Sequence, residues 1–310
     1  MLNRMSFLLF PLLWFVSCNT NNQQKVGETK EASGVEHIPF TLTEHNNLVI
    51  EGIVNNTDTL KLMLHTAANS VSVTEEAVEK ITSMEFEASG TANSWGGSSE
   101  TRSSPNNSLS VANFEWDSLR IWENKHSGHG TDGKIGPDLF EGKIFEINFD
   151  ESLINLYNQL PGNLEAFDKL TIEHKGGFIF LTGNSMLPDS TMGNEFLMHS
   201  GYSGSILFDD EFVNANKLGK ILTTISESEL SDAYGNKLKT KKAILPGFTL
   251  GSTTFNEIPI GFFEGAIGRQ QMSVMGGEII KRFNWIMDLE SGHIYIKQNS
   301  LHNLPFPTEQ

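Results

Sequence analysis

The sequence predicts a mainly β protein whose folded part contains two copies of one structural unit. Two pairs of similar segments, in the same order and at about the same spacing, support this prediction. Between them the chain is rich in short apolar runs that alternate with polar residues and end at turn residues. With 310 residues, the chain is long enough for two domains of ordinary size.

The N-terminus predicts export. Arg4 precedes the apolar run 7–16, which is followed by Ser17 and by Cys18, the only cysteine in the chain. A short basic region, an apolar stretch too short to span a bilayer and a small residue at the cut point are typical of a secretory signal. Because the lone cysteine lies just after the apolar run, the segment resembles a bacterial lipobox. We therefore expect residues 1–18 to be a lipoprotein signal peptide and Cys18 to be acylated.

Residues 19–36 are polar and predict a flexible tether between this anchor and the folded part. The expected location is the bacterial cell envelope, at the periplasmic face or the outer membrane, with the lipid anchor as the only membrane contact. A single cysteine allows no intrachain disulfide, so core packing must supply the stability. The formal net charge of -16 argues against nucleic acid as a partner, because nucleic-acid binding needs a basic surface.

In the first pair of similar segments, an apolar strand runs into a histidine, a hydroxyl residue and a small residue. The matching turn residues are His65, Thr66 and Ala67 in the first copy and His199, Ser200 and Gly201 in the second. An acidic helix-start signal follows each turn, at residues 74–78 and 209–213. The shared order predicts that both turns occupy the same place in their copies.

In the second pair, two residues and a glycine lead into a short helix, at residues 134–140 and 274–280, and a strand follows each helix. Segment 161–175, with Pro161 and Gly162 at its head, is the predicted link. The copies are then an N-terminal lobe over residues 37–160 and a C-terminal lobe over residues 176–302.

The stretches between these landmarks predict further strands and one hairpin in each copy. Strand patterns cover residues 109–114 and 119–122 in the first copy and residues 243–251 and 258–263 in the second. The predicted hairpin tips, each with an aromatic residue beside glycine, are residues 94–97 and 233–236.

This ground plan resembles the retropepsin-like and pepsin-like aspartic peptidases, in their bacterial single-chain, two-lobe form. Each lobe of that family has a strand ending in Asp-Thr-Gly-Ala, a flap hairpin and an apolar-apolar-Gly entry to a short helix. The resemblance covers roughly residues 37–300. It implies a mainly β, bilobed aspartic-protease-like fold of two similar β-barrel-like lobes with short helices, around a central cleft. It also implies that Thr66 and Ser200 lock the two lobes together through reciprocal hydroxyl-to-backbone hydrogen bonds.

The sequence departs from the family at the catalytic positions, because both aspartates would fall on His65 and His199. The family's mechanism uses two carboxylates around one water, whose mutual repulsion splits their pKa values. Neutral imidazole donates and accepts at opposite edges of its ring and is too bulky to copy two coplanar carboxyls. Ala67 also replaces the family's glycine in the first copy, and its Cβ crowds the backbone there. We therefore expect no catalysis by the usual mechanism.

The leading functional hypothesis is a catalytically degenerate family member that binds peptide or another extended ligand in the cleft. Strand-like backbone pairing would hold such a ligand without either aspartate. The expected ligand contacts are Trp95, Gly96 and Gly97 of the flap, together with Tyr202 and Tyr234.

Two alternatives stay open. In the first, the paired imidazoles of His65 and His199 bind zinc or copper, with His126 and His129 as further ligands, in a metal-binding protein or a metal-dependent hydrolase. In the second, the protein is an active aspartic-type endopeptidase with a variant dyad. The plainer interpretations are that His126 and His129 belong to a solvated Gly-rich loop and that the other pair simply fills the dyad.

Overall fold

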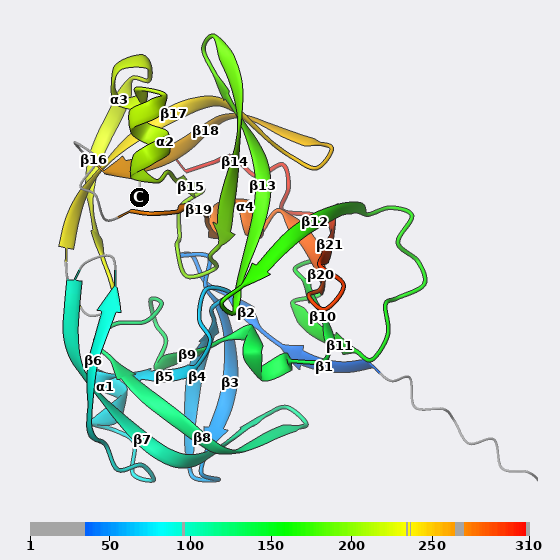
Figure 1. Cartoon of the computed structure of the whole chain (residues 1–310). Helices are drawn as coiled ribbons and strands as arrows, with labels where there is room; N and C mark the ends of the chain where they lie inside the picture. The colour runs from blue at the N-terminus through cyan, green and yellow to red at the C-terminus, as the bar shows by residue number, and fades with distance from the viewer. Residues whose placement is uncertain (1–34, 95–96, 234, 236, 264–269, 308–310) are drawn as a thin grey trace, which may run out of the picture. The chain divides into compact units, whose positions relative to one another are not determined.

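The computed structural model describes residues 35–94, 97–233, 235, 237–263 and 270–307, and Figure 1 shows the path of the chain. The elements of the first copy are β1 (Val35–Pro39), β2 (Thr41–Leu42), β3 (Leu48–Val54), β4 (Asp58–Leu64), β5 (Val71–Thr74), α1 (Glu75–Val78), β6 (Glu87–Ser94), β7 (Gly97–Val111), β8 (Phe114–Asn124), β9 (Gly133–Ile135), the 3-10 helix η1 (Pro137–Phe140), β10 (Ile144–Asn148) and β11 (Leu153–Tyr157).

The second copy begins with a strand that follows an irregular connection. Its elements are β12 (Asp168–Lys175), β13 (Phe178–Leu187), β14 (Ser190–Met198), β15 (Ile206–Leu207), α2 (Asp210–Ala215), α3 (Leu218–Ile221), β16 (Thr224–Ser231), β17 (Lys237–Leu250), β18 (Thr253–Phe263), β19 (Ser273–Met275), α4 (Gly277–Ile280), β20 (Phe283–Asp288) and β21 (His293–Gln298). Among all the residues that the structure describes, in both copies, no helix is both long and apolar enough to span a bilayer.

The strands close into two six-stranded barrels of the same topology. In the first barrel the order is β3-β4-β9-β5-β8-β7, and the pairing of β3 with β7 closes the ring. In the second the order is β13-β14-β19-β15-β18-β17, and β13 pairs with β17. Each strand of the second barrel thus has the place of the strand numbered ten lower in the first (Figure 1). This confirms the predicted mainly β fold of two similar β-barrel-like lobes with short helices.

A shared sheet joins the two copies. Its strand order is β1-β11-β10-β20-β21-β12, with three strands from each copy, and β10 pairs antiparallel with β20 at the junction. β12 pairs with β21 and then with β13, so the predicted link 161–175 contains a strand of this sheet. The irregular connection between the copies is therefore residues 158–167, because Asp168 already begins β12.

The alternating patterns have the expected physical cause. In β3, Leu48, Ile50, Gly52 and Val54 are buried, while Val49, Glu51 and Ile53 between them are more exposed. In β20, five of the six residues are buried because the strand lies in the middle of the shared sheet. The predicted strand 109–114 is wrong: β7 ends at Val111, and Ala112, with φ of 51°, begins the turn into β8.

Candidate functional site

A reciprocal hydrogen-bonded lock joins the turns that follow β4 and β14. The amide of Thr66 donates to the hydroxyl of Ser200 at 3.0 Å, and the amide of Ser200 donates to the hydroxyl of Thr66 at 3.0 Å. The Thr66 hydroxyl donates to the carbonyl of Met198 at 2.7 Å, and the Ser200 hydroxyl donates to that of Leu64 at 2.7 Å. Thr66 and Ser200 are fully buried. The lock that the resemblance implied is therefore present.

The lock has the same backbone setting in both copies. The His65 amide donates to the carbonyl of Ile135 on β9, and the His199 amide donates to that of Met275 on β19, both at 2.9 Å. Each histidine carbonyl then accepts an amide three residues later, which closes a tight turn. Because both turns are fixed by the lock and by these bonds, the histidine that opens each turn is brought to the same central point.

The two imidazoles meet edge to face. Their ring centroids lie 4.6 Å apart, with 61° between the ring planes. The glycine of the second turn permits this approach, because a Cβ on Gly201 would lie 2.4 Å from Nε2 and from Cδ2 of His65. Ala67 holds the equivalent position in the first copy and already carries a Cβ.

The hydrogen bonds of the pair are asymmetric. Nδ1 of His65 accepts the amide of Ala67 at 3.2 Å, which places the ring proton of the neutral form on Nε2. The buried Nδ1 of His199 has no hydrogen-bond partner among the described residues. The pair thus has one ring held by the backbone and one ring held by packing alone.

Burial keeps both imidazoles neutral. It lowers the pKa of His65 well below its ordinary value, and the Lys134 charge, with that of His199 whenever His199 is protonated, lowers it further. Burial and the Lys134 charge lower the pKa of His199 to about 4. No carboxylate among the described residues opposes these shifts at either ring. Both rings are therefore uncharged at neutral pH.

Lys134 is a third titratable group beside the pair. It lies on β9, with Met63 of β4 and Ser72 of β5 as its register partners. Burial lowers the pKa of Lys134 to about 8, so the ammonium form still predominates at pH 7. Sequence reasoning used Lys134 only as a landmark of the repeat. The one signal that could have revealed it is the contrast with Val274, which holds the same place in the second copy.

A buried polar network reinforces the contact between the copies. The Asn46 side-chain amide donates to Glu278 Oε1 and to the Ser203 carbonyl, both at 2.8 Å. Lys281 Nζ donates to Asn46 Oδ1 at 2.9 Å and to Glu278 Oε1 at 2.7 Å. Sequence analysis missed this network, in which Asn46 is more than 230 residues from Glu278 and from Lys281.

The predicted ligand contacts are only partly described. Trp95, Gly96 and Tyr234 lie outside the described residues. Gly97 begins β7 opposite Ser94 of β6, as a hairpin in the predicted place requires. Tyr202 packs against a small apolar cluster of the second barrel, and burial raises the pKa of its phenol. Cys18 and most of the predicted tether also lie outside the described residues.

His126 and His129 lie in the loop between β8 and β9. The ring of His129 stacks on that of His45, with 3.9 Å between centroids, and the amide of His126 donates to the carbonyl of Ala233. Over the residues that the structure describes, no group of three or more His, Cys, Asp or Glu side chains is suited to hold a metal ion. The paired imidazoles His65 and His199 offer two nitrogen ligands.

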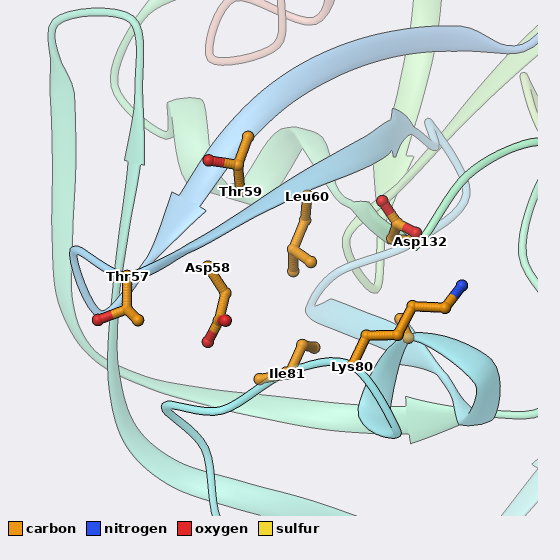
Figure 2. Close-up of a pocket in the computed structure, with 8 residues that line it drawn as sticks. Thr57, Asp58, Thr59, Leu60, Lys80, Ile81 and Asp132 are labelled. Atoms are coloured by element: carbon orange, nitrogen blue, oxygen red, sulfur yellow. The ribbon is translucent and has the colours of Figure 1, made fainter.

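A separate hollow of about 180 Å³ lies on the first barrel, and Figure 2 shows seven of its residues with labels. Its charged groups already have partners. Lys80 pairs with Glu76, Asp132 accepts the amide of Lys61, and Asp58 accepts the amides of residues 82 and 83. The hollow contains neither histidine of the pair, so we assign it no role.

Comparison with known proteins agrees with the fold. No protein-family model matches the chain, and comparison with curated proteins found no match. Among solved structures, the chain is similar to the crystal structure of an aspartic proteinase from Irpex lacteus, with a TM-score of 0.56 and 11% identity. The match covers 87% of this chain and 99% of that one. The chain therefore has the two-barrel fold of the pepsin-like aspartic proteinases.

The arrangement is poorly suited to acid–base chemistry. Two carboxylates can share one proton, whereas each neutral imidazole has one N–H and one lone pair on opposite edges of its ring. The site instead offers two neutral rings beside one ammonium group.

The lock predicts a large and specific loss of stability. Thr66→Val keeps the side-chain shape but leaves the Met198 carbonyl and the Ser200 amide without partners in a buried place. We expect the free energy of unfolding to fall by about 2–4 kcal/mol, measured by urea denaturation. Thr59→Val is the matched control, because it is the same change at an exposed position of β4. Equal effects of the two substitutions would contradict the stabilising role of the lock.

The neutral pair predicts a stability that depends on pH. Between pH 6.5, the ordinary pKa of His, and about 4, the unfolded chain binds a proton that folded His199 does not, so stability is lost as the pH falls through this window. His199→Gln should remove this contribution and flatten the curve of unfolding free energy against pH. The control is His126→Gln, which changes an exposed side chain. Identical curves for wild type and His199→Gln would show that the ring is not held neutral.

Proposed function

We propose that this protein is a catalytically inactive relative of the aspartic proteinases that binds an extended peptide between its two barrels. The observation that carries the proposal is the pair of neutral imidazoles, His65 and His199, in the turns joined by the lock. By resemblance, these are the positions of the catalytic aspartates. The substitution removes the proton-sharing carboxylates while the turns keep their geometry.

Retention of the binding framework supports a ligand. The buried lock and the network around Glu278 hold the two turns and the contact between the copies in place, so the framework on which a peptide would lie is kept. The outer strands β6 and β16 are the ends of their sheets and each belongs to a hairpin. Such edges offer rows of backbone N–H and C=O groups with which an extended peptide can pair. Trp95, Gly96, Gly97, Tyr202 and Tyr234 are the proposed contacts.

The proposal places this activity in the bacterial envelope. Acylation of Cys18 would attach the chain to a membrane. The part of the predicted tether 19–36 that precedes β1, which begins at Val35, would link the lipid to the folded part. The basis is the pattern of the first 36 residues alone. The ligand would then be a peptide segment exposed at the membrane surface.

The proposal predicts peptide binding without cleavage. The purified full-length chain should give only background cleavage of an unfolded protein substrate from about pH 3 to about pH 8, with no effect of pepstatin. An active aspartic proteinase serves as positive control in the same assay. Peptides that compete with one another for the chain should be obtained by selection from a peptide library, because binding needs backbone pairing and not the aspartates.

Two results would overturn the proposal. Clear turnover that is lost in His65→Ala but kept in the exposed His126→Ala would establish an active peptidase with a variant dyad. Stoichiometric zinc or copper that disappears in both His65→Ala and His199→Ala would replace peptide binding by a metal site. In either case the two histidines would have a chemical role that the neutral pair proposed here does not have.

A further inference from the structure

The two barrels differ at one set of equivalent positions beside the paired histidines. Lys134 has Met63 and Ser72 as register partners, and Val274 has Leu197 and Leu207 in the same places of the second barrel. Each set also contains the last residue of the next strand, which is Asn124 of β8 in the first barrel and Phe263 of β18 in the second. The matched residues are Met63 and Leu197, Ser72 and Leu207, Asn124 and Phe263, and Lys134 and Val274. At the three pairs other than Met63 and Leu197, the duplicated fold therefore presents polar residues in the first copy (the polar set) and apolar residues in the second (the apolar set).

In the second copy the chain fills this place itself. Leu207, Phe263 and Val274 form a buried apolar cluster, and Tyr202 packs against it. In the first copy, the residue equivalent to Tyr202 is Ala68, since both donate their amides to the carbonyl of the paired histidine. The small Ala68 side chain cannot cover the polar set as Tyr202 covers the apolar one.

In the first copy, a half-buried ammonium lacks a carboxylate. The amide oxygen of Asn124, oriented to accept the Ser72 hydroxyl at 2.9 Å, also lies 3.3 Å from Lys134 Nζ. No ion pair between described residues includes Lys134. The chain has 38 acidic against 22 basic residues, so acidic partners are plentiful. Burying a charge without a counter-charge costs free energy, which marks Lys134 as a functional group rather than a structural one.

We propose that Lys134 binds the carboxylate of an acidic residue in the ligand, at the point where the ligand passes the paired histidines. This inference rests on the proposed peptide-binding function and names the class of peptide. Asn124, fixed by Ser72, positions the ammonium, and the neutral rings of His65 and His199 add no competing charge. Because the equivalent face of the second copy is apolar, the acidic residue is directed to the first barrel. The ligand is therefore bound in one direction.

Selection from a randomised peptide library on the full-length chain tests this inference. Wild type should enrich peptides with Asp or Glu at a fixed position, and Lys134→Met should lose that enrichment. For one selected peptide, Lys134→Met should weaken binding about 10- to 100-fold, as should Gln in place of its acidic residue. The two changes together should cost little more than either alone, because both remove the same contact. Lys61→Met, an exposed change on the neighbouring strand β4, is the control.

A folding readout separates lost binding from lost structure. Lys134→Met replaces a half-buried charge that has no carboxylate partner by an apolar side chain, as Val274 already does in the second copy, so its Tm should equal or exceed that of wild type. A lower Tm would assign Lys134 a structural partner and overturn the inference.

The remaining outcomes distinguish the inference from the function on which it rests. If wild type and Lys134→Met select the same peptides without an acidic preference, the peptide-binding proposal stands and the proposed carboxylate site is wrong. If neither selects peptides but succinate binds wild type and not Lys134→Met, in isothermal titration calorimetry, the site takes free carboxylates and peptide binding is wrong. If neither peptide nor succinate binds, both are wrong.

Discussion

The four hydrogen bonds between the two turns are the constraint on which the site depends. They connect Thr66 and Ser200 to each other and to the ends of β4 and β14, in a fully buried place. Because each turn is held by the other, the residues that open them must share one small volume. Aspartates in that volume would repel and share a proton, whereas histidines lose their charge and pack. The same framework therefore gives a different chemistry when only the opening residues change.

The charge states of the paired histidines and Lys134 follow from burial more than from ion pairing. Burial is the first cause of the lowered pKa values of His65, His199 and Lys134. The lysine keeps its proton at pH 7 while the imidazoles do not, so the centre has one positive charge that no described carboxylate neutralises. Groups whose pKa values are strongly shifted by burial cluster at functional sites. Binding, rather than hydrolysis, is the use that this arrangement favours.

The sequence was enough to predict the duplication, because it depends on residues that repeat locally: a strand, a histidine, a hydroxyl and a glycine entry to a short helix. The lock was implied by the resemblance to the aspartic peptidases. It was not enough for features set by register. Residues 109–114 resembled one strand, yet Ala112 has a left-handed backbone conformation in the turn between β7 and β8. Residues 168–175 followed Pro and Gly and resembled a link, yet they extend the shared sheet. The surroundings of Lys134 include Ser72, which lies beside it only because β5 pairs with β9.

The protonation state of the paired imidazoles is the most direct test of this interpretation. Long-range ¹H–¹⁵N correlation spectra of the full-length chain at pH 7 report which ring nitrogens carry protons, and His65→Gln and His199→Gln assign the signals. Both rings should be neutral, with the proton of His65 on Nε2 because its Nδ1 accepts the amide of Ala67. An imidazolium signal from either ring at pH 7 would contradict a neutral, noncatalytic centre.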